Sequence, residues 1–132
     1  LDEVEKEDEF VEASVKKVST YQQRSNKIKL MIFMLVYCMW EDDNEYTKKE
    51  KRMFKVITRV ASVNLNKEDT EEIKGFMDIR PNLDSIVRKQ ENYQLDVNDV
   101  IETTSNLRQH LKSKDQYSPV LSRIESRFQY EL

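Results

Sequence analysis

Hydrophobic residues are concentrated in one stretch, from Ile28 to Trp40, in which Lys29 is the one charged residue. A helix with this pattern is apolar on nearly every face and has to be covered by neighbours on all sides. A buried strand is the alternative, but buried strands seldom exceed about 8 residues, and the methionines and leucines of this stretch favour helix. A membrane span needs about 20 apolar residues, and Glu41 ends the run too early for one. The stretch therefore predicts the central helix of a helical domain.

Six further segments show the apolar spacing of amphipathic helices. They cover about residues 8–23, 48–64, 67–77, 83–90, 97–111 and 118–128. Potential cap residues stand before several of these helices and before the central one: Ser25 or Asn26, Asn66, and Ser118 followed by a proline. We expect an all-α fold, a compact bundle of about seven helices around residues 28–40, with residues 1–132 in a single domain.

The charge of the chain is distributed unevenly. Residues 1–12 contain seven acidic residues and Lys6, whereas the remaining 120 contain 21 basic and 18 acidic residues. Acidic segments at the end of a chain are usually solvated and frayed. We therefore expect residues 1–7 to form a frayed acidic tail on a nearly neutral body.

The composition argues against several classes of function. One glycine and two prolines occur in 132 residues, where an average chain of this length has about nine glycines. Phosphate-binding loops and dinucleotide fingerprints need several glycines within one turn, so that the backbone can approach phosphate. The single cysteine, Cys38, lies inside the apolar run and is predicted to be a buried core residue; the lack of an intrachain disulfide fits a cytoplasmic protein. Because the motifs provide neither paired carboxylates nor a nucleophile with its base, we expect a protein that is not an enzyme.

The helix predicted over residues 48–64 has an apolar stripe and a basic stripe. The apolar stripe consists of Met53, Val56, Ile57 and Val60. The basic stripe consists of Lys48, Arg52, Lys55 and Arg59, at spacings of four, three and four. Such a stripe could meet phosphate on nucleic acid or lipid, but specific nucleic-acid binders usually have a strongly basic domain. Because the pI of the chain is near 5.3, nucleic acid is not the expected partner. The stripe is then either a solvated face or a site for another protein.

An acidic turn connects the central helix to this basic helix. Thr47 and Glu50 have the spacing of a capping box, in which the hydroxyl accepts from the Glu50 N–H and the carboxylate accepts from the Thr47 N–H. A calcium loop of the EF-hand type requires a glutamate at its twelfth position. In the three registers tested that position holds Arg52, Met53 or Phe54, so the EF-hand interpretation fails.

The same turn resembles that of the TerB-like family, small helical proteins named for tellurite resistance. Their pattern is a hydrophobic helix, alanine-aspartate-glycine, a variable residue, a hydrophobic residue, serine or threonine, two variable residues, and a glutamate that opens the next helix. The segment Asp43-Asn44-Glu45-Tyr46-Thr47-Lys48-Lys49-Glu50 follows this pattern. Asn44 replaces the glycine, and Asp42 replaces the alanine. The resemblance covers about residues 28–75.

The resemblance implies a protein–protein interaction or adaptor module in a stress-response or membrane-associated assembly. It also implies an alternative function, a divalent cation sensor in which Asp43, Glu45 and Glu50 bind Ca²⁺ or Mg²⁺. From the residues alone, the favoured interpretation is that Glu50 is a capping carboxylate and that the other two are solvated, since the helix dipole stabilises such groups without a metal. Apart from such a cation no cofactor is expected. Another protein is the expected partner, no membrane is spanned, and a homo-oligomer is an open alternative.

Overall fold

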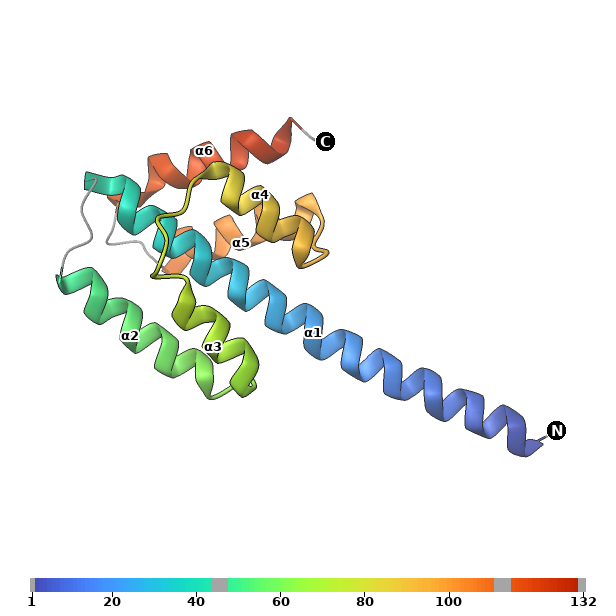
Figure 1. Ribbon diagram of the computed structural model, residues 1–132. Coiled ribbons are helices and arrows are strands. Elements are labelled where there is room, and N and C mark those ends of the chain that lie inside the picture. Colours follow the sequence, from blue (N-terminus) through green and yellow to red (C-terminus); the bar gives the residue numbers. More distant parts are fainter. Residues whose placement is uncertain (1, 44–47, 111–114, 131–132) are drawn as a thin grey trace.

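The computed structural model describes residues 2–43, 48–110 and 115–130, and the side chains of residues 20–41, 48–110 and 116–130. Every regular element within these ranges is helical (Figure 1). The elements are α1 (Asp2–Asp43), α2 (Lys48–Ser62), α3 (Lys67–Gly75), α4 (Leu83–Asn92), α5 (Val97–His110), the short 3₁₀ helix η1 (Asp115–Tyr117) and α6 (Ser118–Gln129). The predicted all-α class is confirmed for the described part of the chain.

The number of helices differs from the prediction. The described residues contain six α-helices rather than seven, because the helices predicted over residues 8–23 and 28–40 are one continuous helix, α1. The predicted cap between them was wrong, since neither candidate side chain caps a helix start. Ser25 Oγ donates to Asp69 Oδ2 at 2.6 Å, and Asn26 Nδ2 donates to the carbonyl of Tyr93 at 3.1 Å. No glycine or proline interrupts α1, so nothing in the backbone forces a break. The fraying expected of residues 1–7 stays a prediction.

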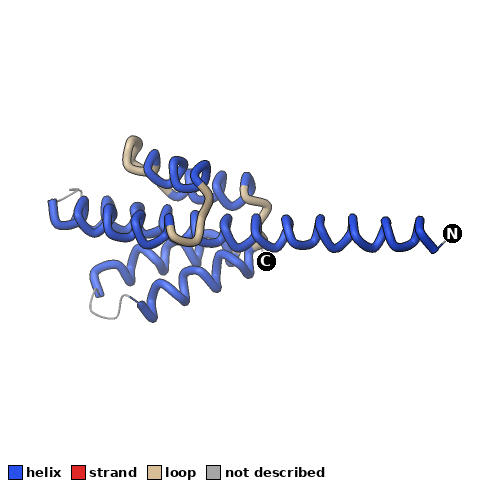
Figure 2. The backbone as a smooth tube through the Cα atoms, turned by 90° about the horizontal axis from the view of Figure 1, so that it is seen from below, coloured by secondary structure: helices blue, strands red, loops and turns tan. Residues whose placement is uncertain are grey.

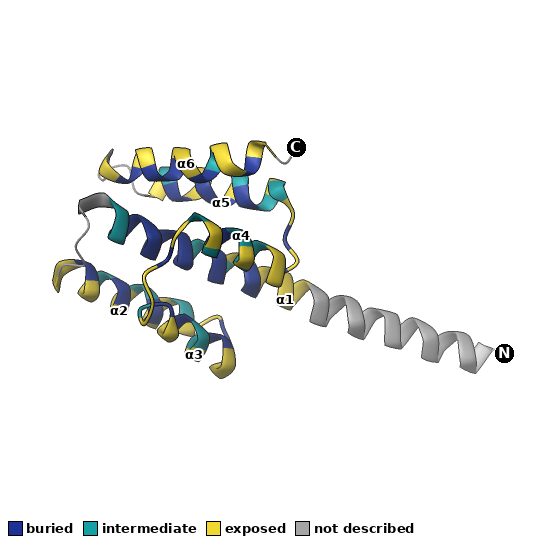
Figure 3. Cartoon of the chain, turned by 45° about the horizontal axis from the view of Figure 1, so that its top comes forward, coloured by how far each residue is buried: buried dark blue, intermediate teal, exposed yellow. Residues whose placement is uncertain are grey.

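The apolar residues 28–40 lie in the C-terminal part of α1. Leu30 and all of residues 32–39 are buried there, and α1 contacts each of the other helices and η1. Figure 3 shows this part of α1 in dark blue between the surrounding helices, whereas the N-terminal part extends beyond them in Figures 1 and 2. Full burial of a leucine, isoleucine or phenylalanine side chain stabilises a fold by about 1.5–3 kcal/mol. This short segment therefore supplies a large share of the hydrophobic stabilisation.

Lys29, the one charged residue of the apolar run, is buried and connects α1 to α3. Its Nζ lies 2.9 Å from Asp69 Oδ1 and 3.4 Å from Glu72 Oε1. Asp69 also accepts hydrogen bonds from the hydroxyls of Ser25, at 2.6 Å, and Tyr21, at 3.4 Å. Burial acts to raise the pKa of the Asp69 carboxyl, but the hydrogen bonds from Ser25 and Lys29 and the charge of Lys29 outweigh burial and lower it. This cluster fixes α3 against the core.

Of the two other predicted helix caps, one is confirmed and one is wrong. Asn66 caps α3, with its Oδ1 accepting from the backbone N–H of Asp69 at 2.8 Å. Ser118 does not cap α6, because Tyr117 is the residue before the helix and makes no side-chain cap. The Ser118 hydroxyl instead accepts from Arg108 Nη1 at 2.6 Å, which connects α5 to α6.

Candidate functional site

The acidic turn lies mostly outside the described residues. Glu45 and Thr47 are outside the described residues, and so is the side chain of Asp43. Two of the proposed ligands and the capping box therefore remain predictions. The Glu50 side chain is described and buried, and its Oε2 accepts a hydrogen bond from the Tyr117 hydroxyl at 3.1 Å. No group of three His, Cys, Asp or Glu residues within the described ranges could hold a metal ion. The structure thus places Glu50 in a buried contact between α2 and η1.

The buried face of α2 differs from the predicted apolar stripe. Met53 and Ile57 are partly buried, but Val56 and Val60 are 54 % and 63 % exposed. The prediction was therefore wrong for these two valines. The buried column of α2 consists of Glu50, Phe54 and Thr58. Residues four apart share a helix face. Because two of these three residues are polar, the spacing of hydrophobic residues does not indicate that this face is buried.

All four residues of the predicted basic stripe, Lys48, Arg52, Lys55 and Arg59, are exposed. The structure divides them between two surfaces. Lys55 and Arg59 line a groove between α2 and α3, whereas Lys48 and Arg52 do not line it. The latter two instead share one helix face with exposed valines. We call this surface the outer face of α2. It consists of Lys48, Arg52, Val56 and Val60, each four residues from the next, together with Val63 in the turn directly after the helix.

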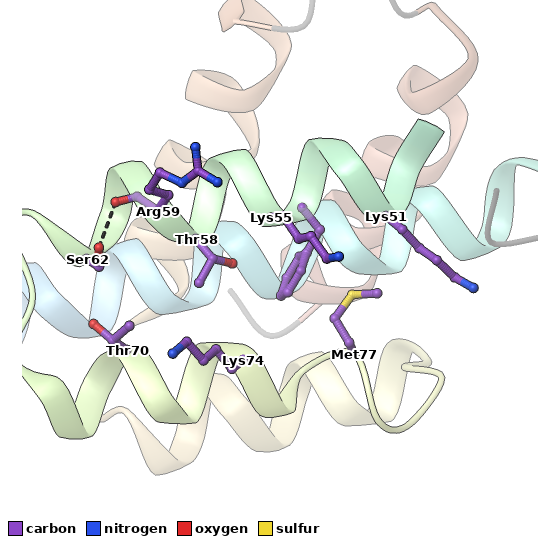
Figure 4. A pocket seen from close by; sticks show the side chains of 9 residues that line it. Lys51, Lys55, Thr58, Arg59, Ser62, Thr70, Lys74 and Met77 are labelled. Atoms are coloured by element: carbon purple, nitrogen blue, oxygen red, sulfur yellow. Dashed lines mark hydrogen bonds between the residues drawn. The ribbon is translucent and has the colours of Figure 1, made fainter. Parts of the chain in front are cut away.

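The α2–α3 groove has a volume of about 700 Å³ (Figure 4), within the range of about 300–1,000 Å³ that is common for small-molecule sites. Its lining residues are Lys51, Phe54, Lys55, Thr58, Arg59 and Ser62 from α2, and Thr70, Lys74 and Met77 from α3 and the turn that follows. Four of these nine residues are basic, and none is acidic. The groove is therefore a positively charged concave surface.

The groove has a polar end and an apolar end. In Figure 4, Arg59 and Thr70 lie at the polar end, whereas Met77 lies at the apolar end together with Lys51. Between the two ends, the Lys55 side chain extends toward Met77 from α2, and the Lys74 side chain extends toward Thr70 from α3. Phe54 is buried and belongs to the lining. The groove can therefore accommodate a charged group and an apolar group at the same time.

The lysines and the arginine of α2 that line the groove make no ion pair within the described residues. Lys74 lies 3.4 Å from Glu71, but both of these side chains are more than half exposed, so water screens the pair and it is worth little. Because exposed cations at close spacing repel one another, an anion placed among them relieves unfavourable charge.

Thr58 provides a hydrogen-bond donor that has no acceptor in the described part of the chain. Its side chain is 7 % exposed, and its Oγ1 has no hydrogen-bond partner among the described residues. The other two hydroxyls of the groove donate to backbone carbonyls, Ser62 to Arg59 at 2.7 Å and Thr70 to Asn66 at 2.9 Å. A buried hydroxyl without a partner costs about 1–3 kcal/mol. The Thr58 hydroxyl is thus a buried donor in the groove wall without an acceptor among the described residues.

Lys55 and Arg59 were predicted from the sequence as members of the basic stripe, but the other groove residues were not. Lys51 and Thr58 could have been found, because with Lys55 they follow at helical spacing beside the buried Phe54. The contributions of α3 and its turn depend on how two helices pack. No local pattern indicates them.

Three comparisons with known proteins found no match: no family model, no curated protein and no solved structure. Within the described residues, none of the helices combines the length and the apolarity needed to cross a lipid bilayer.

Proposed function

We propose that this protein is a non-enzymatic interaction module that binds another protein through the outer face of α2. The observation that supports the proposal is the exposure of three valines: Val56 and Val60 are 54 % and 63 % exposed on one face of α2, and Val63, in the turn that follows the helix, is 81 % exposed. Single exposed apolar residues are common, whereas a contiguous apolar patch is typical of an interaction site. An adaptor of this kind, in a cytoplasmic stress-response or membrane-associated assembly, is what the TerB-like resemblance implies.

The outer face also has the chemistry to select its partner. Its first half carries the cations Lys48 and Arg52, and its second half carries the three valines. An amphipathic helix with acidic residues at one end and leucine or isoleucine at the other would complement both halves. Covering each exposed valine contributes about 1 kcal/mol, and the charges add mainly specificity and a faster association rate.

The alternative function, a divalent cation sensor, receives less support. Of its proposed ligands, Glu50 is the one whose side chain is described, and its carboxylate is buried against the Tyr117 hydroxyl. A metal at Glu50 would have to compete with that hydrogen bond and lose hydration in a buried position.

The experiment is affinity capture with the full chain, combined with cross-linking that maps the contact to a helix. The outer-face variant is Lys48→Glu with Arg52→Glu and Val60→Ser, which leaves the groove residues unchanged. Its control is Lys67→Glu with Arg88→Glu, because both residues are exposed and lie on other helices. We expect the outer-face variant to lose the partner and the control to retain it. Retention by both variants, or cross-links confined to α5 and α6, would refute the proposed surface.

A further inference from the structure

We propose that the α2–α3 groove binds a single-chain anionic amphiphile, with its acidic head at the polar end and its hydrocarbon tail at the apolar end. The ligand class comprises fatty acids and alkyl phosphates, which share a compact anion and one apolar chain. The groove lies on the side of α2 that faces α3. The proposal therefore goes beyond the protein partner of the outer face and does not depend on it.

The head is recognised by one hydroxyl and by cations on both walls. Thr58 Oγ1 is buried, projects from α2 toward the gap in Figure 4, and has no partner among the described residues. It donates to a carboxylate or phosphate oxygen. Lys55 and Arg59 stand on either side of Thr58 along α2, and Lys74 faces them from α3. Hydrogen bonds to a charged acceptor are about twice as strong as those between neutral groups. The anion therefore satisfies a donor that the described residues leave without an acceptor.

The tail lies over Phe54 and Met77 at the other end of the groove. The unbranched thioether side chain of methionine adapts to an apolar guest of variable shape. The aliphatic stems of Lys51 and Lys55 extend this apolar surface while their ammonium groups remain in water. A tail placed here is covered by α2 on one side and by the turn after α3 on the other.

The groove fits this class better than other anions. Inorganic phosphate would fill a small part of its volume of about 700 Å³ and would leave the apolar end exposed. Single-stranded nucleic acid is bound by stacking of successive bases on several aromatic rings, but Phe54 is the one aromatic residue among the nine that line the groove. An amphiphile uses both ends of the groove at once.

The first experiment is calorimetry of the full chain with four probes, each held below its critical micelle concentration. These are laurate, dodecyl phosphate, dodecanol and inorganic phosphate. Laurate and dodecyl phosphate are expected to bind. Dodecanol is expected to bind at least about tenfold more weakly, because it lacks the anionic head. Inorganic phosphate is expected to give no detectable heat of binding. Equal affinity for dodecanol and laurate would overturn the role of the cationic end, and equal affinity for inorganic phosphate would overturn that of the apolar end.

The second experiment separates the head contact from the fold. Thr58→Val keeps the shape of the side chain and removes the unpartnered hydroxyl, so we expect an unchanged or higher melting temperature and an affinity for laurate lowered by about tenfold. Lys55→Met keeps the stem and is expected to weaken laurate binding to a similar extent, whereas Lys67→Met, outside the groove, is the matched control.

Undiminished laurate binding by Thr58→Val would overturn the site. So would binding to phosphatidylglycerol vesicles without binding of monomeric laurate, because that result would assign the cations to a membrane surface. The outer-face variant is expected to bind laurate normally, which distinguishes a failure of this proposal from a failure of the proposed protein partner.

Discussion

Replacing Lys29 with methionine tests how α3, one wall of the groove, is held against the core. The Lys29 Nζ is 2.9 Å from Asp69 Oδ1, and both side chains are less than a tenth exposed. Methionine fills much of the same volume but leaves the Asp69 carboxylate buried without its cation. Removing one partner of a buried ion pair costs about 3–5 kcal/mol. Because the Ser25 and Tyr21 hydroxyls still donate to Asp69, we expect a cost at the lower end, about 3 kcal/mol.

The dependence of this cost on pH provides a second check. The pKa of Asp69 is lowered in the folded protein, so its stabilising contribution is complete above the unfolded pKa of about 3.9. The contribution disappears as the pH falls through the lower folded pKa. In Lys29→Met the carboxyl loses its cation and binds a proton at a higher pH than in the parent. The difference in unfolding free energy between parent and variant should therefore be largest near pH 7 and should narrow as the solution becomes acidic.

Urea denaturation followed by far-ultraviolet circular dichroism, at several pH values, measures both effects. The matched control is Lys27→Met on the same helix, since Lys27 forms a partly exposed pair with Asp99 at 3.3 Å and should cost less than about 1 kcal/mol. If Lys29→Met lowers the unfolding free energy by no more than the Lys27→Met control does, the reasoning is refuted. A difference in unfolding free energy between parent and variant that stays constant with pH would also refute it.

Three further predictions concern other parts of the chain. Glu50→Ala removes the carboxylate that accepts the Tyr117 hydrogen bond and opens space beside it, so it should lower the unfolding free energy by about 2 kcal/mol. Glu50→Gln keeps an oxygen at this position and should cost less in the same urea titration. Cys38 is fully buried, so iodoacetamide should modify it in urea and not in buffer, and rapid labelling in buffer would contradict its burial. Calorimetry with millimolar Ca²⁺ and Mg²⁺ should give no binding heat, and a saturable heat abolished by Asp43→Asn with Glu45→Gln would favour the cation sensor instead.

The fold class could be predicted from the sequence because its signal is local. The spacing of apolar residues and the shortage of glycine predict helices without reference to packing, and the Asn66 cap was found in the same way. The predicted break within α1 failed because Ser25 and Asn26 were interpreted as local caps. Their side chains bond to α3 and to the end of α4, and sequence spacing does not show such tertiary partners.

The candidate site could be predicted only in part. Lys55 and Arg59 were visible as members of a basic stripe, but the sequence could not show that the stripe divides between a groove and an outer face. The orientation of α2 is determined by Phe54 together with the buried Glu50, which the sequence pattern indicated as a capping or metal-binding residue and not as a core residue. The Thr58 hydroxyl gains significance only once its burial and its lack of a partner among the described residues are known.

The most direct test of the α2–α3 groove is amide hydrogen exchange of the full chain with and without saturating laurate. Exchange reports where a ligand stabilises local structure. The groove predicts slower exchange in residues 51–62 and 70–77, with little change in α5, and no such pattern with dodecanol at the same concentration. Protection confined to α5 and α6, or equal throughout the chain, would contradict a ligand site between α2 and α3.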